Sequence, residues 1–250
     1  MKKESFVIKH PKTWIIILSL ILTIAMMIFP VTSGVITVIR NLNTIEGYWL
    51  QGLFMTLSII VPVIYIKAAK INFKQIGFSG IKRESAKMVL YFLPLVIAKI
   101  PFLFYGIEND TDKIVALIYF TIAIGVSEEI YFRGIILKRL LQSFTTKRSI
   151  IISALFFAMA HASQAFSGTG MIMVVLTIIN ALIFGIIAAE LLVITESIIP
   201  LIIWHTLYDF VNWISLAEGL TEVVIISVQS VIIMVYACYL WIKLPKRRKN

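Results

Sequence analysis

Charged residues and cysteine are scarce in this chain of 250 residues. Only 14% of the residues are charged, against about 25% in a soluble domain, and 60% are hydrophobic, against roughly 45 to 50%. One soluble core cannot hide this excess of apolar side chains. Cys238 is the only cysteine, which excludes a disulfide framework and a cysteine metal site. The composition therefore predicts a single membrane-embedded domain over residues 1–250.

Long apolar runs recur along the whole sequence, each close to the roughly 20 residues that cross a hydrocarbon layer of about 30 Å. Lone strands would leave backbone groups unpaired in lipid, and the runs lack the alternation of barrel strands. We therefore expect an all-α, polytopic membrane helical bundle of about eight transmembrane helices. The expected spans are 14–39, 48–66, 87–106, 114–137, 149–163, 171–194, 199–217 and 222–242.

The net charge of +10 would suit nucleic acid, but the positions of the basic residues argue against it. Most of the 23 Lys and Arg fall on one side of an eight-span bundle, which predicts that both termini are cytoplasmic. The expected partners are the lipid bilayer of the cell membrane and a substrate, and no nucleic acid. The basic residues on this side are four before the first span, six at 67–87, four at 138–148 and five at 243–249, together 19.

Charged side chains inside the spans are informative, because each costs about 2.5 to 3.5 kcal/mol on insertion scales. They concentrate in SEEIYFRG and IIWHTLYDF, and FFAMAH adds a histidine. At about 1.5 Å per residue, Glu128, His161 and Asp209 lie roughly 15 to 18 Å from the expected cytoplasmic ends, and His205 roughly 9 Å. We therefore expect one polar cavity, slightly on the cytoplasmic side of the midplane.

The two adjacent glutamates in the first of these segments have different expected tasks. Glu129 and Arg133 are four residues apart with the acid first, so they share a helix face and predict a structural ion pair. Glu128 is rotated by about 100° from Glu129, which leaves its carboxylate free for chemistry. Lys99 and Glu190 are isolated, and snorkelling or local pairing explains them.

Two further pairs repeat the four-residue spacing. His205 shares a helix face with Asp209, and His161 shares one with Phe157. Interhelical hydrogen bonds alone would explain a single pair. Two histidines and a spare carboxylate at one depth are more than helix packing requires. They supply a general base, proton donors and candidate metal ligands.

The ordered motifs EExxxR, FxxxH and HxxxD, which here begin at Glu128, Phe157 and His205, resemble those of the CPBP family. This family comprises the type II CaaX prenyl endopeptidases and the bacterial Abi or bacteriocin-processing proteins. The resemblance covers about residues 114–213, which we expect to form a CPBP/Abi-like catalytic core. Each motif alone is weak, whereas all three in order, each within its own span, are a specific signal.

The resemblance implies roles for the motif residues. Glu128 would activate water, His161 would help to hold that water, and His205 with Asp209 would stabilise the oxyanion. This division suits peptide hydrolysis, which needs a base for water and donors for the tetrahedral oxyanion. The residues expected to support the site are Glu129, Arg133 and Phe157.

Asp209 departs from the family pattern, since CaaX endopeptidases usually have Asn there. An ionised carboxylate cannot donate a hydrogen bond. Asp209 is therefore protonated, or it orients His205, or it helps to hold a cation. The family is also described as metalloproteases, and the candidate ligands of a divalent metal such as zinc are Glu128, His161, His205 and Asp209. A metal-free site in which Glu128 activates water is equally compatible with the sequence.

The sequence thus predicts an intramembrane endopeptidase that hydrolyses a peptide bond in a membrane-associated or peptide substrate near the cytoplasmic face. The alternative is a non-catalytic bacteriocin-immunity or regulatory protein of the same fold, although every polar motif position is retained. A proton-coupled transporter would also use carboxylates and histidines, but duplicated halves are not found. The composition, rich in Lys and Ile, suggests a bacterial protein, and the substrate and oligomeric state stay open.

Overall fold

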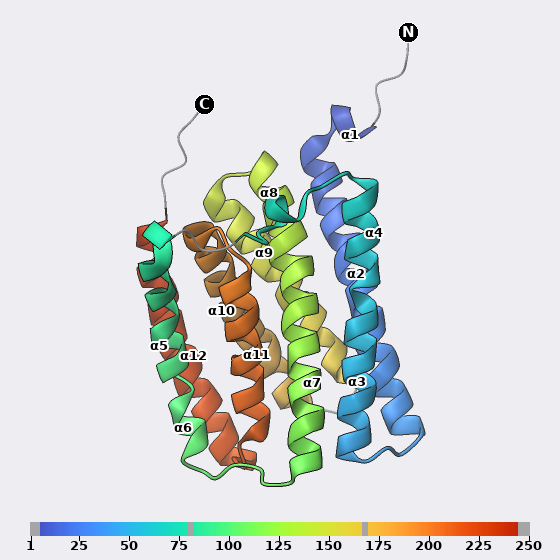
Figure 1. Cartoon of the computed structure of the whole chain (residues 1–250), viewed down its shortest axis with the longest axis vertical. Coiled ribbons are helices and arrows are strands. Elements are labelled where there is room, and N and C mark those ends of the chain that lie inside the picture. Colours follow the sequence, from blue (N-terminus) through green and yellow to red (C-terminus); the bar gives the residue numbers. More distant parts are fainter. Residues whose placement is uncertain (1–5, 80–82, 167–169, 245–250) are drawn as a thin grey trace.

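The computed structural model describes residues 6–79, 83–166 and 170–244, which form a bundle of helices packed side by side (Figure 1). Within these ranges the extended structure is limited to one isolated bridge, between Ile107 and Ser215. The all-α polytopic fold is therefore confirmed.

Helical elements of three kinds follow one another along the described chain: α-helices, 3-10 helices and one π-helix. In order they are α1 (Phe6–Lys9), α2 (Pro11–Ile39), α3 (Thr44–Ser58), α4 (Ile60–Ala68), η1 (Phe73–Ile76), η2 (Arg83–Phe92), α5 (Leu93–Ile97), α6 (Ile100–Leu103), α7 (Thr111–Glu128), η3 (Glu129–Leu137), α8 (Lys138–Ser143), α9 (Thr146–His161), η4 (Ala162–Phe166), α10 (Met171–Thr195), α11 (Ile199–Ile214) and α12 (Gly219–Lys243).

Six helical stretches in the described ranges are long and apolar enough to cross a membrane. They confirm the multi-pass character of the chain and correspond to six of the eight expected spans. The exact number of eight is not confirmed. The six stretches are Pro11–Ile39, Thr44–Ala68, Thr111–Ser143, Thr146–Phe166, Met171–Thr195 and Gly219–Lys243.

The two remaining expected spans differ from long α-helices. The span expected at 87–106 is broken into η2, α5 and α6, which follow one another along the bundle (Figure 1). Pro94 and Pro101 lie in the first turns of α5 and α6, where a proline begins a helix but cannot continue the preceding hydrogen-bond ladder. The span expected at 199–217 is α11, with 16 residues, and Pro200 lies in its first turn.

The two ends of the bundle carry opposite charges. We call one the basic end: α1, the start of α2, α8 and the end of α12 lie there (Figure 1). The acidic end is the opposite one, where α3, α7 and α12 begin with Glu46, Asp112 and Glu222 in their first turns. The expected segregation of basic segments is therefore present, and the cytoplasmic location of the basic end stays a prediction.

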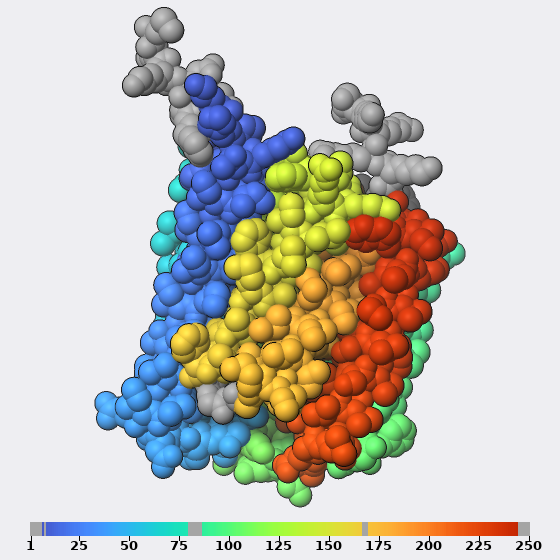
Figure 2. Space-filling model, turned by 180° about the vertical axis from the view of Figure 1, so that it is seen from behind, coloured from blue at the N-terminus to red at the C-terminus, as the bar shows by residue number. Residues whose placement is uncertain are grey.

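Small residues let the central helices approach closely. A Cβ atom added to Gly125 of α7 would lie 3.1 Å from the backbone nitrogen of Thr206 in α11, and one added to Gly185 of α10 would lie 3.0 Å from Cα of Ala154 in α9. Side chains larger than hydrogen would push these helices apart. On the face seen from behind relative to Figure 1, α2, α9, α10 and α12 lie next to one another (Figure 2).

The transmembrane stretch that begins with α7 changes its helix type in the middle. It is α-helical up to Glu128 and continues as the π-helix η3, whose nine residues are all buried. The expectation of a regular α-helix over 114–137 is therefore wrong for the second half. π-helical turns are rare and occur frequently at functional sites, and this one begins between the two glutamates.

Candidate functional site

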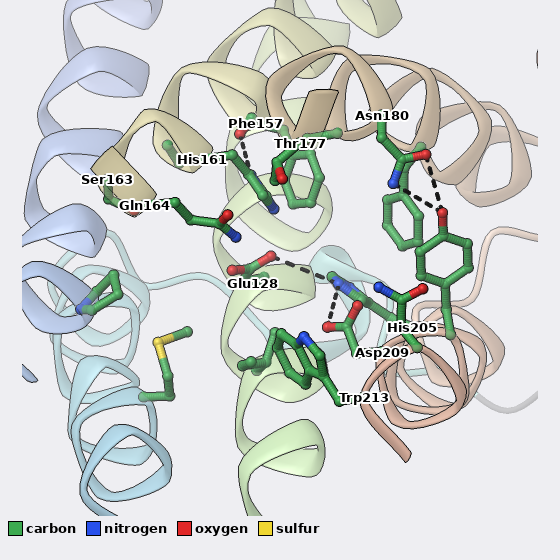
Figure 3. A pocket seen from close by; sticks show the side chains of 18 of the residues that line it. Glu128, Phe157, His161, Ser163, Gln164, Thr177, Asn180, His205, Asp209 and Trp213 are labelled. Atoms are coloured by element: carbon green, nitrogen blue, oxygen red, sulfur yellow. Dashed lines mark hydrogen bonds and ion pairs between the residues drawn. The ribbon is translucent and has the colours of Figure 1, made fainter. Parts of the chain in front are cut away.

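A cavity of about 350 Å³ lies inside the bundle. Its volume falls in the range of about 300 to 1,000 Å³ that is typical of small-molecule sites. Side chains from four motif positions point into it: Glu128 from α7, His161 from α9, and His205 and Asp209 from α11 (Figure 3). Phe157 contributes to the wall. The structure therefore brings together the residues that the sequence singled out on three separate helices.

Glu129 lies behind this cavity and binds two partners. Its Oε1 accepts a hydrogen bond from Nη1 of Arg133 at 3.0 Å and lies 2.7 Å from Nδ1 of His205. The side chains of Glu129 and Arg133 are almost completely buried, with exposed fractions of 0% and 1%. The expected ion pair is therefore present, and the contact with His205, which spacing along one helix could not reveal, gives Glu129 a second task.

The bond to Glu129 fixes the orientation of His205. A carboxylate only accepts hydrogen bonds, so Nδ1 of His205 carries the proton of this bond. Nε2 then faces the cavity, where it lies 3.7 Å from Oε2 of Glu128 and 3.6 Å from Oδ2 of Asp209. Both distances exceed a direct hydrogen bond. A carboxylate that orients an imidazole through its far nitrogen is a recurring arrangement in hydrolytic sites.

His161 is held by its own helix. Its Nδ1 lies 2.9 Å from the carbonyl oxygen of Phe157, which is an acceptor, so Nδ1 is the protonated nitrogen and Nε2 of the neutral ring is free to accept. The ring of Phe157 also packs 4.1 Å from the guanidinium of Arg133 and 6.1 Å from the ring of His205. Phe157 therefore supports both histidines and the buried arginine.

The candidate metal ligands do not form a ready-made metal site. Among the described residues, no group of three or more His, Cys, Asp or Glu side chains is arranged to hold a metal ion. On the cavity side of His205, Nε2 lies 3.7 Å from Oε2 of Glu128 and 3.6 Å from Oδ2 of Asp209. The described donors therefore do not form a preformed zinc site.

Lys99 lies next to the site, and the sequence did not reveal this placement. It is 4% exposed, and its Nζ donates a hydrogen bond to Oδ1 of Asn212 at 3.0 Å and lies 3.4 Å from the ring centroid of Tyr208. Both partners come from α11 and line the cavity. Lys99 is therefore held by partners that lie close to it in space, and it does not snorkel. Only the fold brings 99 next to 212, so no local spacing could have indicated this contact.

Glu190 was expected to snorkel or to pair locally, and it does neither among the described residues. It is completely buried in α10, and neither carboxylate oxygen has a hydrogen-bond partner there. It does not line the cavity. We find no role for it in the site.

The cavity extends toward the acidic end of the bundle. Its walls include Ser33 in the last part of α2, Gln51 in the first half of α3, Gln164 in η4 and Glu222 in the first turn of α12. The sequence placed the polar layer slightly toward the basic, cytoplasmic side. The cavity reaches beyond these motif residues toward the acidic end, and the depth of the polar layer relative to the midplane stays a prediction.

Part of the chain is similar to a known protein family. Residues 110–211 match the model of the type II CAAX prenyl endopeptidases that are described as Rce1-like. The matched segment contains all three motifs and covers less than half of the chain. A comparison with curated proteins found no match.

Proposed function

Since residues 110–211 match the family model of the Rce1-like type II CAAX prenyl endopeptidases, we propose that this membrane protein is an intramembrane endopeptidase in which Glu128 activates water. The observation that carries the proposal is the different setting of the two adjacent glutamates. Glu129 is held by Arg133 and His205, whereas Glu128 lines the cavity and its Oε2 has no hydrogen-bond partner among the described residues.

Glu128 is the group that we propose as the general base. A water molecule in the cavity transfers a proton to its carboxylate, and the remaining hydroxide attacks the carbonyl carbon of the scissile peptide bond. The tetrahedral intermediate then collapses, the C–N bond breaks, and Glu128 returns the proton to the leaving amine. His161, whose Nε2 is free to accept, holds the attacking water in place.

His205 is the proposed donor to the oxyanion. Its Nδ1 is bonded to Glu129, so Nε2 donates to the oxyanion only when the ring is the protonated imidazolium. The carboxylates of Glu128 and Glu129 lie beside this ring and compensate its positive charge. Donors fixed where negative charge develops are commonly worth about 10² to 10³ in kcat.

Asp209 keeps two of its three candidate roles. Glu129 already orients His205 through Nδ1, so a second orienting carboxylate is unnecessary. Hydrogen-bond donation from a protonated carboxyl group and cation binding are the roles that are compatible with its position in the cavity wall.

The test compares Glu128→Gln with the wild type. Gln keeps the shape of the side chain and removes the base, so the products that the wild type makes in the membrane peptidome should disappear while the bundle stays folded. Glu218→Gln is the matched control, because this exposed glutamate lies at the start of α12 without a capping bond. Full cleavage by purified Glu128→Gln would refute the proposal, and a chelator arm tests metal dependence separately.

The alternative of a non-catalytic immunity or regulatory protein makes a different prediction for the same variant. A scaffold should keep its biological effect in Glu128→Gln and should show no difference in the peptidome. The open carboxylate of Glu128 beside two fixed histidines favours the enzyme.

A further inference from the structure

We infer that the peptide substrate enters the cavity from the acidic end of the bundle, so that the enzyme cleaves extracytoplasmic segments of exported peptides or membrane proteins. This inference rests on the proposed function and adds the side of access and the class of substrate. Two observations carry it: the cavity reaches the acidic end, and tightly packed side chains close the opposite end.

The residues at the mouth of the cavity lie where helices begin or end. Gln164 belongs to the short helix η4 that follows α9, Met173 lies in the first turn of α10, and Glu222 lies in the first turn of α12. The end of η4 and the start of α10 lie in the lower part of the face shown in Figure 2, at the acidic end. Gln164 is only half-buried and points toward the space between His161 and Glu128 (Figure 3). A peptide that enters here reaches the proposed base directly.

The path from the basic end is blocked. Beyond Glu129 the side chains of Phe132, Ile136, Leu140 and Ile150 are at most 1% exposed, and they fill the space toward α8. A hydrogen bond also fixes the π-helix to the end of α3 beside this layer. The hydroxyl of Tyr131 donates to the carbonyl of Ser58 at 3.0 Å, and interiors at this packing density leave no room for a peptide.

The charge of the cavity wall indicates which peptides fit. Glu128, Asp209 and Glu222 line it, and the described lining contains neither Lys nor Arg. A free C-terminal carboxylate would meet carboxylates of the same charge, and such repulsion is strong where water is excluded. The proposed imidazolium of His205 does not offset this repulsion, because Glu128 and Glu129 already compensate its charge. A neutral or basic segment avoids this cost, and the amides of Gln51, Gln164 and Asn180 can bond to its backbone.

The location of the basic end indicates on which side of the membrane the cavity mouth opens. Among the described segments, the start of α2, α8 and the end of α12 carry Lys or Arg and lie at the end opposite to the cavity mouth, and the positive-inside rule places such segments in the cytoplasm. The mouth is then extracytoplasmic. This is the reverse of access from the cytoplasm, which the depth of the motif residues alone had indicated.

Cysteine accessibility tests the side of access. In a Cys238→Ser background, Gln164→Cys should react with a membrane-impermeant maleimide in spheroplasts, because Gln164 lies at the mouth. Gln142→Cys, at an exposed position in α8 of the basic end, should react only in inverted vesicles. Glu222→Cys is the second reporter of the mouth if Gln164→Cys folds poorly. Labelling of the mouth positions only in inverted vesicles would overturn the inference.

A cleavage assay separates this inference from the proposed function. Quenched fluorescent peptides with basic or acidic residues are added to spheroplasts and to inverted vesicles that contain the wild type or Glu128→Gln. The inference expects the basic peptides to be cleaved by wild-type spheroplasts and not by intact inverted vesicles. Cleavage that depends on Glu128 but occurs only in inverted vesicles would refute the side of access and support the peptidase. Undiminished cleavage by Glu128→Gln would refute the peptidase, while the labelling pattern would still report the side.

Discussion

The buried pair of Glu129 and Arg133 makes the sharpest prediction for stability. Arg133→Met removes the guanidinium and leaves the carboxylate of Glu129 uncompensated at a position with no exposure. Breaking a buried pair in this way typically costs about 3 to 5 kcal/mol. Here His205 still donates to the same oxygen at 2.7 Å. We therefore expect a loss of about 3 kcal/mol in the free energy of unfolding, at the lower end of this range.

A second substitution identifies the cause of that loss. Glu129→Gln removes the negative charge and keeps an amide oxygen that can accept from His205. In the double variant Arg133→Met, Glu129→Gln no buried charge is left without a partner. Replacement of a buried pair by neutral groups is often neutral or stabilising. The double variant should therefore lose no more than about 1 kcal/mol, the usual size of one hydrogen bond. It should be more stable than Arg133→Met alone.

The free energies of unfolding can be measured by chemical denaturation in mixed micelles. Arg148→Met serves as the control, because it also replaces an arginine, at an exposed position near the start of α9. Such surface substitutions usually change the free energy of unfolding by no more than about 0.5 kcal/mol. A double variant that is no more stable than Arg133→Met would refute the reasoning, since the loss would then come from packing of the guanidinium on Phe157 and not from the uncompensated charge.

Two further substitutions test the geometry and the chemistry of the site. Gly125→Ala places a Cβ atom 3.1 Å from the backbone of Thr206, so we expect a loss of about 1 to 3 kcal/mol in the free energy of unfolding and reduced cleavage. Gly170→Ala is the control, because its Cβ atom meets no atom of the described residues within 4 Å. It should leave cleavage unchanged and cost less than about 1 kcal/mol, as a change at a helix N-cap. Equal behaviour of the two variants would contradict the close approach of α7 and α11. Asp209→Asn should keep cleavage if Asp209 donates as a protonated group, and should lose it together with metal-stimulated activity if Asp209 binds a cation. Cleavage with and without chelator distinguishes these roles.

The parts of the fold that the sequence predicted depend on local rules. Apolar length identified six spans, because the hydrocarbon layer sets a nearly fixed number of residues. The cost of charge in lipid pointed to the motif residues, and the four-residue spacing predicted the bond between Glu129 and Arg133. Each of these inferences needs only neighbours along one helix, which is why they could be made before the fold was known.

The parts that the sequence did not predict depend on contacts between distant segments. Lys99 looked isolated because its partner Asn212 lies on another helix. The break of the third expected span could have been suspected from Pro94 and Pro101, yet prolines are also tolerated inside membrane helices. The open side of the cavity follows from how eight elements pack, and no single span contains that information.

The two adjacent glutamates show why the same residue type serves two purposes here. Glu128 is the last residue of α7, and Glu129 is the first residue of the π-helix. Glu129 turns into the packed side of the bundle, where an arginine and a histidine donate to it. Glu128 turns to the cavity, where its Oε2 is left without a partner among the described residues. Stability therefore depends mainly on the second carboxylate and the proposed chemistry on the first, so substitutions at 128 and at 129 should separate catalysis from folding.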